Sequence, residues 1–314
     1  MPANWTDALG LTVLRATLRP ERPWRHDEPA LALRGALGAA VLHLACVHDP
    51  VACRACPVRP CPAADWYDRG LRGGGAHRPF WLRARSGPDG RVDERSPLRL
   101  TWTFEGELPR ASLVLEAVHR AARVGLGAER IPHGVDLEWW DGDGWRSAES
   151  STPAAVPLTT LARPLPAEGP VVIRTVTRLR LKREGRVLRR PTVADLVEAL
   201  VLRIRAMERR LGVSPAPAWP APEPFGAPVR CAWATGGRWS RRQGEEVDLS
   251  GADAAWAVDA AEVAPWADLL AVARTLQLGA ATTAGLGVLE VSAVAGDFAA
   301  GAPRRGVSRS SRSA

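Results

Sequence analysis

Both halves of the 314-residue sequence end in the same way, with a helical stretch, a Gly-Leu-Gly turn and a strand of alternating apolar residues. The turns are Gly125-Leu126-Gly127 and Gly285-Leu286-Gly287, and the strands after them are expected at 134–140 and 287–294. Glycine reaches positive φ without steric cost, so it suits a tight turn between a helix and a strand. The repeated ending indicates that the chain contains one structural unit twice.

The spacing of apolar residues predicts the same order of elements in each half: strand, helix, strand, strand, helix, strand. In the first half they are expected at 9–18, 29–46, 78–85, 97–105, 110–124 and 134–140, and in the second at 171–182, 192–211, 229–234, 254–260, 265–276 and 287–294. The strands 78–85 and 97–105 should pair as a hairpin. Two copies of this βαββαβ order predict an α+β protein with two tandem ferredoxin-like domains.

Composition sets the expected domain boundaries. Residues 147–170, rich in Ser, Thr, Ala and Pro, are expected to link an N-terminal domain, 1–146, to a C-terminal domain, 171–296. A cysteine-rich insertion is expected at 46–77. The basic residues 297–314 have too little apolar content to pack and should form a disordered tail.

Charge favours a polyanionic partner. The chain has 42 basic against 34 acidic residues, and Lys182 is its only lysine. A biased coding genome can explain the preference for arginine over lysine, but not the excess of basic residues, so nucleic acid is the favoured partner. The sequence has no apolar run long enough to span a membrane and no signal for export, so we expect no membrane association and a cytoplasmic location.

The expected strand 171–182 places cations on one face. Arg174, Arg178, Arg180 and Lys182 alternate with apolar residues, and at about 3.3 Å per residue they span roughly 26 Å. Such a row suits a nucleic acid backbone, although it is equally typical of a solvated sheet face. Further arginines follow at positions 183, 186, 189 and 190, and they favour binding.

Four cysteines lie within sixteen residues, at Cys46, Cys53, Cys56 and Cys61. In a cytosolic protein this spacing favours a structural Zn²⁺ site over a disulfide framework. A redox pair, an iron–sulfur site and simply packed thiols are the alternatives. A site closed by four thiolates leaves no open position for catalysis, so zinc would stabilise the fold.

Acid–base chemistry near neutral pH would use one of six histidines. His43 falls on the small-residue flank of its expected helix, beside Ala39 and Ala40, and is therefore not expected in the core. A lone histidine in such a place is more often unrelated to catalysis. His43 and the nearby His48 are also close enough in sequence to the cysteines to belong to a metal site.

The glycine-rich stretch 278–291 is expected to form a loop between a helix and a strand. Closely spaced glycines let backbone N–H groups approach a phosphate, although ordinary turns have similar sequences. The chain contains no GxGxxG after its first strand, no Walker-type GxxxxGK[ST] and no GxSxG, which argues against nucleotide-binding and serine-hydrolase functions.

Several of these segments together resemble one protein family. RTVTRLRLKREGRVLRRPTVADLVEALVLRIRAMERRLG at 174–212, RWSRRQ at 238–243 and LGAATTAGLGVLEV at 278–291 are similar to the C-terminal half of CRISPR-associated repeat-RNA endoribonucleases of the RAMP superfamily. LRGALGAAVLHLAC at 33–46, the cysteines after it and RPFWL at 78–82 are similar to the N-terminal half of bacterial members.

The resemblance implies two ferredoxin-like domains that bind a CRISPR repeat RNA and cut it once without a metal. The products implied are a 2′,3′-cyclic phosphate and a 5′-hydroxyl. It also implies that a histidine at or just after the first helix moves the proton, with His43 as first choice and His48 as second. Lys182 is expected in the catalytic region. The expected RNA-binding residues are Arg34, Arg174, Arg178, Arg180, Arg183, Arg238, Ser240, Arg241, Gly279, Gly285 and Gly287.

One departure from the family pattern supports an alternative. Relatives often have a lysine and an aromatic residue in the terminal loop, where this chain has Ala280 and Ala284. The alternative is a non-catalytic subunit that holds CRISPR RNA among the proteins of an effector complex. A zinc-containing nucleic-acid scaffold outside CRISPR systems is more distant, and a homodimer is left open as an assembly.

Overall fold

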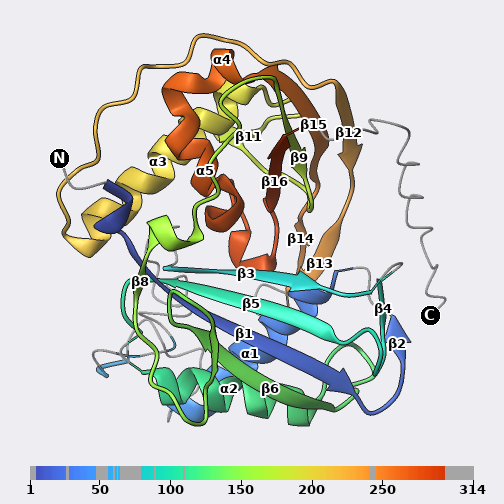
Figure 1. Cartoon of the computed structure of the whole chain (residues 1–314). Coiled ribbons are helices and arrows are strands. Elements are labelled where there is room, and N and C mark those ends of the chain that lie inside the picture. Colours follow the sequence, from blue (N-terminus) through green and yellow to red (C-terminus); the bar gives the residue numbers. More distant parts are fainter. Residues whose placement is uncertain are drawn as a thin grey trace.

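The structure is a computed structural model that describes residues 5–25, 28–46, 56–58, 61, 63, 79–87, 90–108, 110–240 and 245–293. Figure 1 shows two sheets, one above the other, each with helices packed against it. The predicted basic tail at 297–314 and most of the predicted cysteine-rich insertion lie outside the described residues.

The first sheet contains the strands of the N-terminal half. Its order is β3 (Phe80–Arg85), β5 (Leu98–Glu105), β1 (Gly10–Pro20), β6 (His133–Trp140) and β7 (Trp145–Ser147), and every neighbouring pair is antiparallel. Helices α1 (Pro29–Ala45) and α2 (Ala111–Val124) share a core with one face of this sheet. The predicted pairing of the strands near 78–85 and 97–105 is confirmed, and the first four strands have the ferredoxin-like order.

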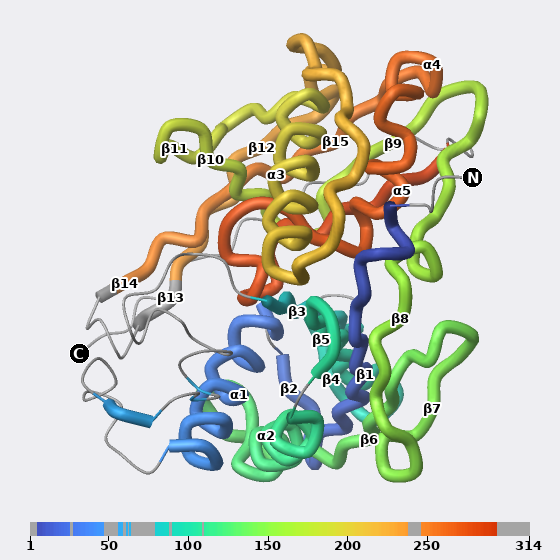
Figure 2. The backbone as a smooth tube through the Cα atoms, turned by 90° about the vertical axis from the view of Figure 1, so that its left-hand side faces the viewer, coloured from blue at the N-terminus to red at the C-terminus, as the bar shows by residue number. Residues whose placement is uncertain are grey.

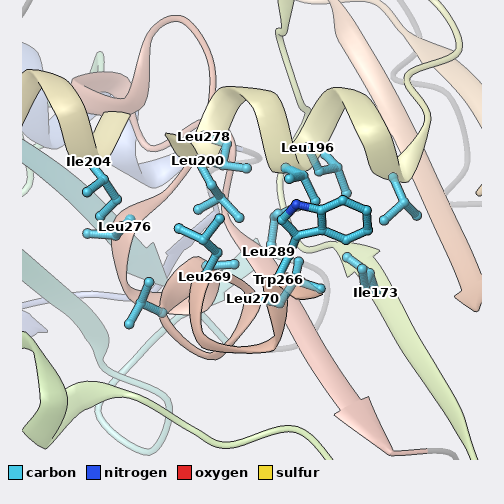
Figure 3. Close-up of a cluster of buried hydrophobic side chains, with 14 of the residues drawn as sticks. Ile173, Leu196, Leu200, Ile204, Trp266, Leu269, Leu270, Leu276, Leu278 and Leu289 are labelled. Carbon is cyan, nitrogen blue, oxygen red and sulfur yellow. The ribbon is translucent and has the colours of Figure 1, made fainter. Parts of the chain in front are cut away.

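The second sheet has the same arrangement. Its order is β12 (Arg230–Ala234), β15 (Gly251–Asp259), β9 (Pro170–Thr175) and β16 (Leu289–Ala293), again antiparallel. Helices α3 (Val193–Leu211) and α5 (Ala267–Leu276) cover one face. Figure 3 shows Leu196, Leu200 and Ile204 of α3 pointing toward the side chains of α5 and the sheet.

Local chemistry explains the sharp ends of α3. The Thr192 hydroxyl accepts a hydrogen bond from the Asp195 amide, and the Asp195 carboxylate accepts one from the Thr192 amide, so two N–H groups of the first turn are satisfied. Gly212 ends the helix with φ of 67°, a left-handed conformation that glycine tolerates. Both ends agree within one residue with the predicted range 192–211.

Several short elements were not predicted. They include β2 (Trp24–Arg25), β4 (Arg91–Val92), β7, β8 (Val156–Pro157), β10 (Lys182–Arg183), β11 (Arg186–Val187), β13 (Gly237–Ser240), β14 (Glu245–Asp248) and α4 (Ala260–Val263). β10 pairs with β11 and β13 with β14, which forms two hairpins attached to the second half. No helix in the described ranges combines the length and apolar character needed to cross a bilayer.

The predicted strand 171–182 is wrong in its extent, because β9 ends at Thr175. The amides of Val176 and Thr177 both donate to the Val288 carbonyl, which interrupts the regular ladder. The chain then makes isolated bridges, from Leu179 to Ala252 and from Arg180 to Gly279. Arg174, Arg178, Arg180 and Lys182 therefore do not form one row on a continuous strand.

The two halves share part of one core. Leu11, Val13 and Trp81 from the first sheet are buried in the same cluster as the apolar faces of α3 and α5. The predicted linker 147–170 contributes too, since β8 pairs with β1 and Leu158 is fully buried. The boundaries at residues 146 and 171 stay a prediction.

Candidate nucleic-acid interface

The glycine-rich loop lies at the junction between the two halves. It contacts β3 and α1, and a Cβ on Gly285 would lie 2.2 Å from the Cβ of Ala30 in α1. A Cβ on Gly287 would lie only 1.8 Å from the Leu278 carbonyl oxygen, and Gly287 has φ of 75°. These two glycines are therefore required by close packing, whatever else the loop does.

Most amides of this loop bond to backbone carbonyls. Ala280 donates to the Arg180 carbonyl and Gly287 to the Arg178 carbonyl, both at 2.9 Å, while Gly285 donates to the Thr282 carbonyl at 3.0 Å. A phosphate could use these three donors only by displacing a carbonyl. The family-based prediction that Gly279, Gly285 and Gly287 contact RNA stays a prediction.

Arg34 joins α1 to the same loop. Its side chain is buried, and its Nε donates to the Thr283 hydroxyl at 3.4 Å. The contact supports the position of α1 against the loop. Direct contact of Arg34 with RNA stays a prediction.

Arg178 and Arg180 connect the loop to neighbouring elements. Arg178 forms an ion pair with Glu28, the residue before α1, and donates to the Thr235 carbonyl at 2.7 Å. Arg180 is buried, donates to the Ser250 carbonyl and lies 3.5 Å from the Asp248 carboxylate. Burial, followed by the charge of Arg180, lowers the pKa of Arg178. Both arginines therefore have internal acceptors.

The exposed cations near this region belong to the β10–β11 hairpin and the loop after it. Lys182, Arg186 and Arg190 are exposed, and the Arg189 guanidinium lies 5.3 Å from the centre of the Trp233 ring. Figure 2 shows β10–β11 and β13–β14 along the same side of the molecule. Arginine beside tryptophan on an exposed surface is a combination that binds single-stranded nucleic acid.

Arg183 and Arg174 are exposed but already paired with acids. Arg183 lies 2.5 Å from Asp195 and 3.3 Å from Glu198, and Arg174 lies 2.6 Å from Glu290. The Arg183–Glu198 pair is exposed and therefore weak, so an RNA phosphate could replace Glu198, whereas Asp195 is buried and also bonded to Thr192.

A cleft of about 400 Å³ lies at the base of the β13–β14 hairpin. Its lining includes Glu246 and Asp248, and hydrogen bonds from Ser250 lower the pKa of Asp248. Two carboxylates make this cleft a poor site for a phosphate. Two of the predicted RNA-binding residues, Arg238 and Ser240, lie on β13 beside it, and Arg241 lies outside the described residues.

His43 is exposed in the last turn of α1, away from the loop junction. Arg34 contacts the loop nine positions earlier, a separation of about 14 Å along the helix axis at 1.5 Å per residue. The structure therefore does not bring His43 and the glycine-rich loop together. His48 lies outside the described residues, so the choice between the two histidines stays a prediction.

The predicted metal site is described only in part. Cys46 follows α1 and is half-buried, as is Cys56, while Cys61 is buried in the core of the first half. Cys53 lies outside the described residues. Within the ranges that the structure covers, no group of three or more His, Cys, Asp or Glu side chains is arranged to hold a metal ion.

Comparison with known proteins agrees with this architecture. Residues 9–141 match a family described as AF_1859_N, N-terminal domain. A solved Cas6 (TTHB231) product complex matches with a TM-score of 0.51 and 17% identity, over 89% of this chain and 98% of the other. A Cas6 (TTHA0078) product complex matches with a TM-score of 0.49 and 16% identity, over 90% and 100%. Thermus thermophilus Cas6 (TTHB231) matches with a TM-score of 0.47 and 13% identity, over 90% and 98%.

A search of curated proteins by sequence found no match. The TTHB231 complex nevertheless aligns with 89% of the chain, and both sheets of this chain have the ferredoxin-like strand order. In its fold, this chain is similar to the solved Cas6 (TTHB231) protein.

Proposed function

We propose that the protein binds CRISPR repeat RNA and cuts it as an endoribonuclease. The observation that carries the proposal is the fold, which over 89% of the chain resembles a Cas6 protein solved with its product. The excess of basic over acidic residues, 42 against 34, supports a polyanionic substrate. The family resemblance of segments 174–212 and 278–291 supports repeat RNA as that substrate.

The proposed cut needs no metal. The 2′-hydroxyl oxygen attacks the adjacent phosphorus while the bond from phosphorus to the 5′ oxygen breaks. A base removes the proton of the 2′-hydroxyl and an acid gives one to the departing oxygen, so protons balance. The products are a 2′,3′-cyclic phosphate and a 5′-hydroxyl. Cations stabilise the additional negative charge of the phosphorane-like transition state.

We assign the proton transfer to His43 and keep His48 as the second choice. His43 is exposed and therefore accessible to a bound RNA. Lys182, exposed on β10, is proposed to contact the phosphates together with Arg183. We propose that Arg34, Arg174, Arg178, Arg180, Arg238, Ser240, Arg241, Gly279, Gly285 and Gly287 position the RNA or the elements that bind it.

The test is cleavage of the protein's own repeat RNA in EDTA, followed at single-nucleotide resolution. One defined cut is expected. His43→Ala should slow the cut at least a hundredfold, the usual contribution of a general acid or base, and should change affinity by less than about twofold. His119→Ala, on α2, is the matched control and should cut like wild type. Tight binding without any cut would contradict the enzymatic proposal.

A non-catalytic subunit that holds CRISPR RNA is the second candidate. Ala280 and Ala284 replace the lysine and aromatic residue often found in this loop, and the Ala280 amide is already bonded to Arg180. This candidate predicts stable co-purification with RNA and with proteins of an effector complex, and no cut. The mass of the purified particle, measured by light scattering, would also reveal a homodimer.

We further propose that the two halves are tandem ferredoxin-like domains and that the cysteines of the first hold a structural zinc ion. Four thiols within sixteen residues supply the donors that Zn²⁺ prefers. Metal analysis of the purified chain should find about one zinc per molecule, as one four-thiolate site binds one ion. Cys56→Ser should lose the zinc, and Cys231→Ser should keep it.

A further inference from the structure

Gln277 combines three unusual features at the point where α5 ends. Its φ is 48° and its ψ 144°, a backbone conformation that residues with a side chain rarely adopt. It is only 1% exposed, although its side chain is polar. Its Oε1 is buried and has no hydrogen-bond partner among the residues that the structure describes. Backbone strain and an unsatisfied acceptor both oppose folding, so the presence of glutamine here requires an explanation.

The surrounding core holds the backbone of Gln277 in this conformation. Leu276 before it and Leu278 after it are fully buried, and Figure 3 shows both among the apolar side chains that pack against α3. The Leu278 amide donates to the Gly287 carbonyl at 2.8 Å, which closes the loop directly after Gln277. Glycine would adopt the same φ without strain, as it does at position 279 of this loop. The side chain of residue 277, and not its backbone, therefore explains why it is not glycine.

That side chain joins the two halves of the molecule. Its Nε2 donates to the Leu82 carbonyl at 3.0 Å. Leu82 lies on β3, at the end of the first sheet's strand order that faces the second half (Figure 1). Two residues before Gln277, the Thr275 carbonyl accepts a hydrogen bond from the Trp81 indole at 2.7 Å. The end of α5 is thus bonded to two successive residues of β3, and we call these two hydrogen bonds the β3–α5 latch.

The loop after Gln277 continues this connection into the second half. The Ala280 amide donates to the Arg180 carbonyl at 2.9 Å. β10 begins two residues after Arg180, and its first residue is the exposed Lys182. Contacts therefore run without a break from the Leu82 carbonyl, through Gln277 and the loop backbone, to the segment that carries Lys182.

The same loop contacts the first half at α1. Arg34 of α1 donates to the Thr283 hydroxyl at 3.4 Å. α1 also carries His43, to which we assign proton transfer, whereas Lys182 belongs to the second half. The two groups proposed to act at the cut therefore lie on different halves. Their relative placement depends on how the halves are held together, and a small misplacement of reacting groups slows a reaction strongly.

We propose that Gln277 is a positioning residue for the cut. Its side chain holds the first sheet against the glycine-rich loop, so that His43 and Lys182 act on one phosphodiester. This inference rests on the proposed function. Gln277 itself contacts neither the RNA nor a transferred proton. The strained backbone and the unpaired Oε1 are tolerated because the side chain fixes the junction between the halves.

The simpler alternative is that Gln277 only covers the edge of β3, as edge strands often require. Removing its side chain would then change stability and leave the cleavage rate at saturating RNA unchanged. The two readings therefore differ in which measured quantity a substitution at position 277 affects.

The experiment measures cleavage of repeat RNA by the full chain over a range of RNA concentrations and pH. Gln277→Met keeps the approximate size of the side chain and removes the donor to Leu82. The rate at saturating RNA should fall about tenfold or more, while the half-saturating concentration changes less than about twofold, because placement and not binding is lost. The pH dependence of the rate should keep its shape, since glutamine does not titrate. If Gln277→Met does not fold, Gln277→Gly, which suits the backbone conformation, decides by the same criteria.

Ala281→Gly is the matched control. Ala281 lies in the same loop with φ of 64°, and its methyl group makes no hydrogen bond, so the variant removes a strained side chain and leaves the β3–α5 latch intact. It should cut like wild type. An equal loss of rate in Ala281→Gly would assign the effect to loop flexibility in general and overturn the proposal. A wild-type rate in a folded Gln277→Met, or a loss confined to RNA affinity, would overturn it as well.

Hydrogen exchange separates this inference from the proposed function, because it needs no cleavage. Amides of β3 should exchange faster in Gln277→Met than in wild type or in Ala281→Gly, with no RNA present. Unchanged exchange in β3 would show that Gln277 does not hold the junction and would overturn the proposal. Faster exchange together with a wild type that does not cut would retain the latch and reject the endoribonuclease function.

Discussion

Two partly buried arginines, Arg178 at the loop junction and Arg83 on β3, differ in their surroundings. Arg178 is paired with Glu28 and bonded to the Thr235 carbonyl, and it joins α1, the glycine-rich loop and the base of the β13–β14 hairpin. Arg83 is surrounded by other arginines, and its buried Nε and Nη2 lack an acceptor within the described ranges. The pKa of both guanidiniums is lowered by burial.

This difference distinguishes an arginine whose charge stabilises the fold from an arginine whose charge does not. A buried cation with internal acceptors stabilises the fold, and removing it leaves those acceptors unsatisfied. A buried cation among like charges is costly, so removing it should not lower stability. Sequence alone cannot distinguish the two, because both arginines lie in stretches whose alternating pattern predicts a strand.

The largest expected effect tests whether the loop junction is structural. Gly287→Ala places a Cβ 1.8 Å from the Leu278 carbonyl oxygen at φ of 75°, so the loop must shift. We expect a loss of about 3 kcal/mol or more in the free energy of unfolding, measured by urea denaturation. Gly185→Ala is the control, since it has φ of 80° but open space around it, and should cost about 1 kcal/mol. Equal losses would show that the loop is not tightly packed.

The next effect compares the two arginines directly. Arg178→Met should lower the free energy of unfolding by about 2 kcal/mol, less than for a fully buried pair because Glu28 is partly exposed. Arg83→Met should leave stability unchanged or raise it. Urea denaturation of both variants in one buffer gives the two free energies of unfolding, which can then be ranked. The reverse ranking would contradict the distinction between the two sites.

The third effect concerns His133, a buried titratable side chain to which we assign no role in ligand binding. It is 6% exposed, and burial lowers its pKa below 6.5. The unfolded chain binds a proton near the ordinary pKa of about 6.5 while the folded chain does not, so stability should fall as pH drops through that range. Melting temperatures measured across that range should fall less in His133→Gln. An identical pH dependence in the two proteins would rule out His133 as the cause.

The smallest expected effect tests whether the Glu290 carboxylate weakens RNA binding at the neighbouring arginines. Glu290→Gln removes the carboxylate that pairs with Arg174, so affinity for repeat RNA should rise about threefold, a modest gain because the site is partly solvated. Titration of fluorescent RNA detects such a change. Weaker binding would indicate that Glu290 positions Arg174 for the RNA.

Much of the fold was accessible from sequence because local patterns determine it. The apolar spacing that predicts a helix over 192–211 is a local feature, and α3 (Val193–Leu211) matches it. The strand 171–182 failed because Val176 and Thr177 bond to Val288, which is over a hundred residues away. Short hairpins such as β13–β14 have too few residues for a clear period.

The candidate sites were less predictable because they combine distant segments. Gln277 gives no signal in the sequence and meets the Leu82 carbonyl only when α5 and β3 pack together. Arg178 and Arg180 were predicted as an exposed track, and their acceptors lie on elements that the alternation of one strand does not reveal. The roles of His43, Lys182 and the cysteines stay predictions.

The most direct test of the account uses repeat RNA with a single 2′-deoxy substitution at the nucleotide before the cut. Attack by the 2′-hydroxyl predicts that wild-type protein binds this RNA with unchanged affinity and does not cut it, while unmodified RNA ends in a 2′,3′-cyclic phosphate. Cleavage of the substituted RNA at the normal rate and position would contradict the account.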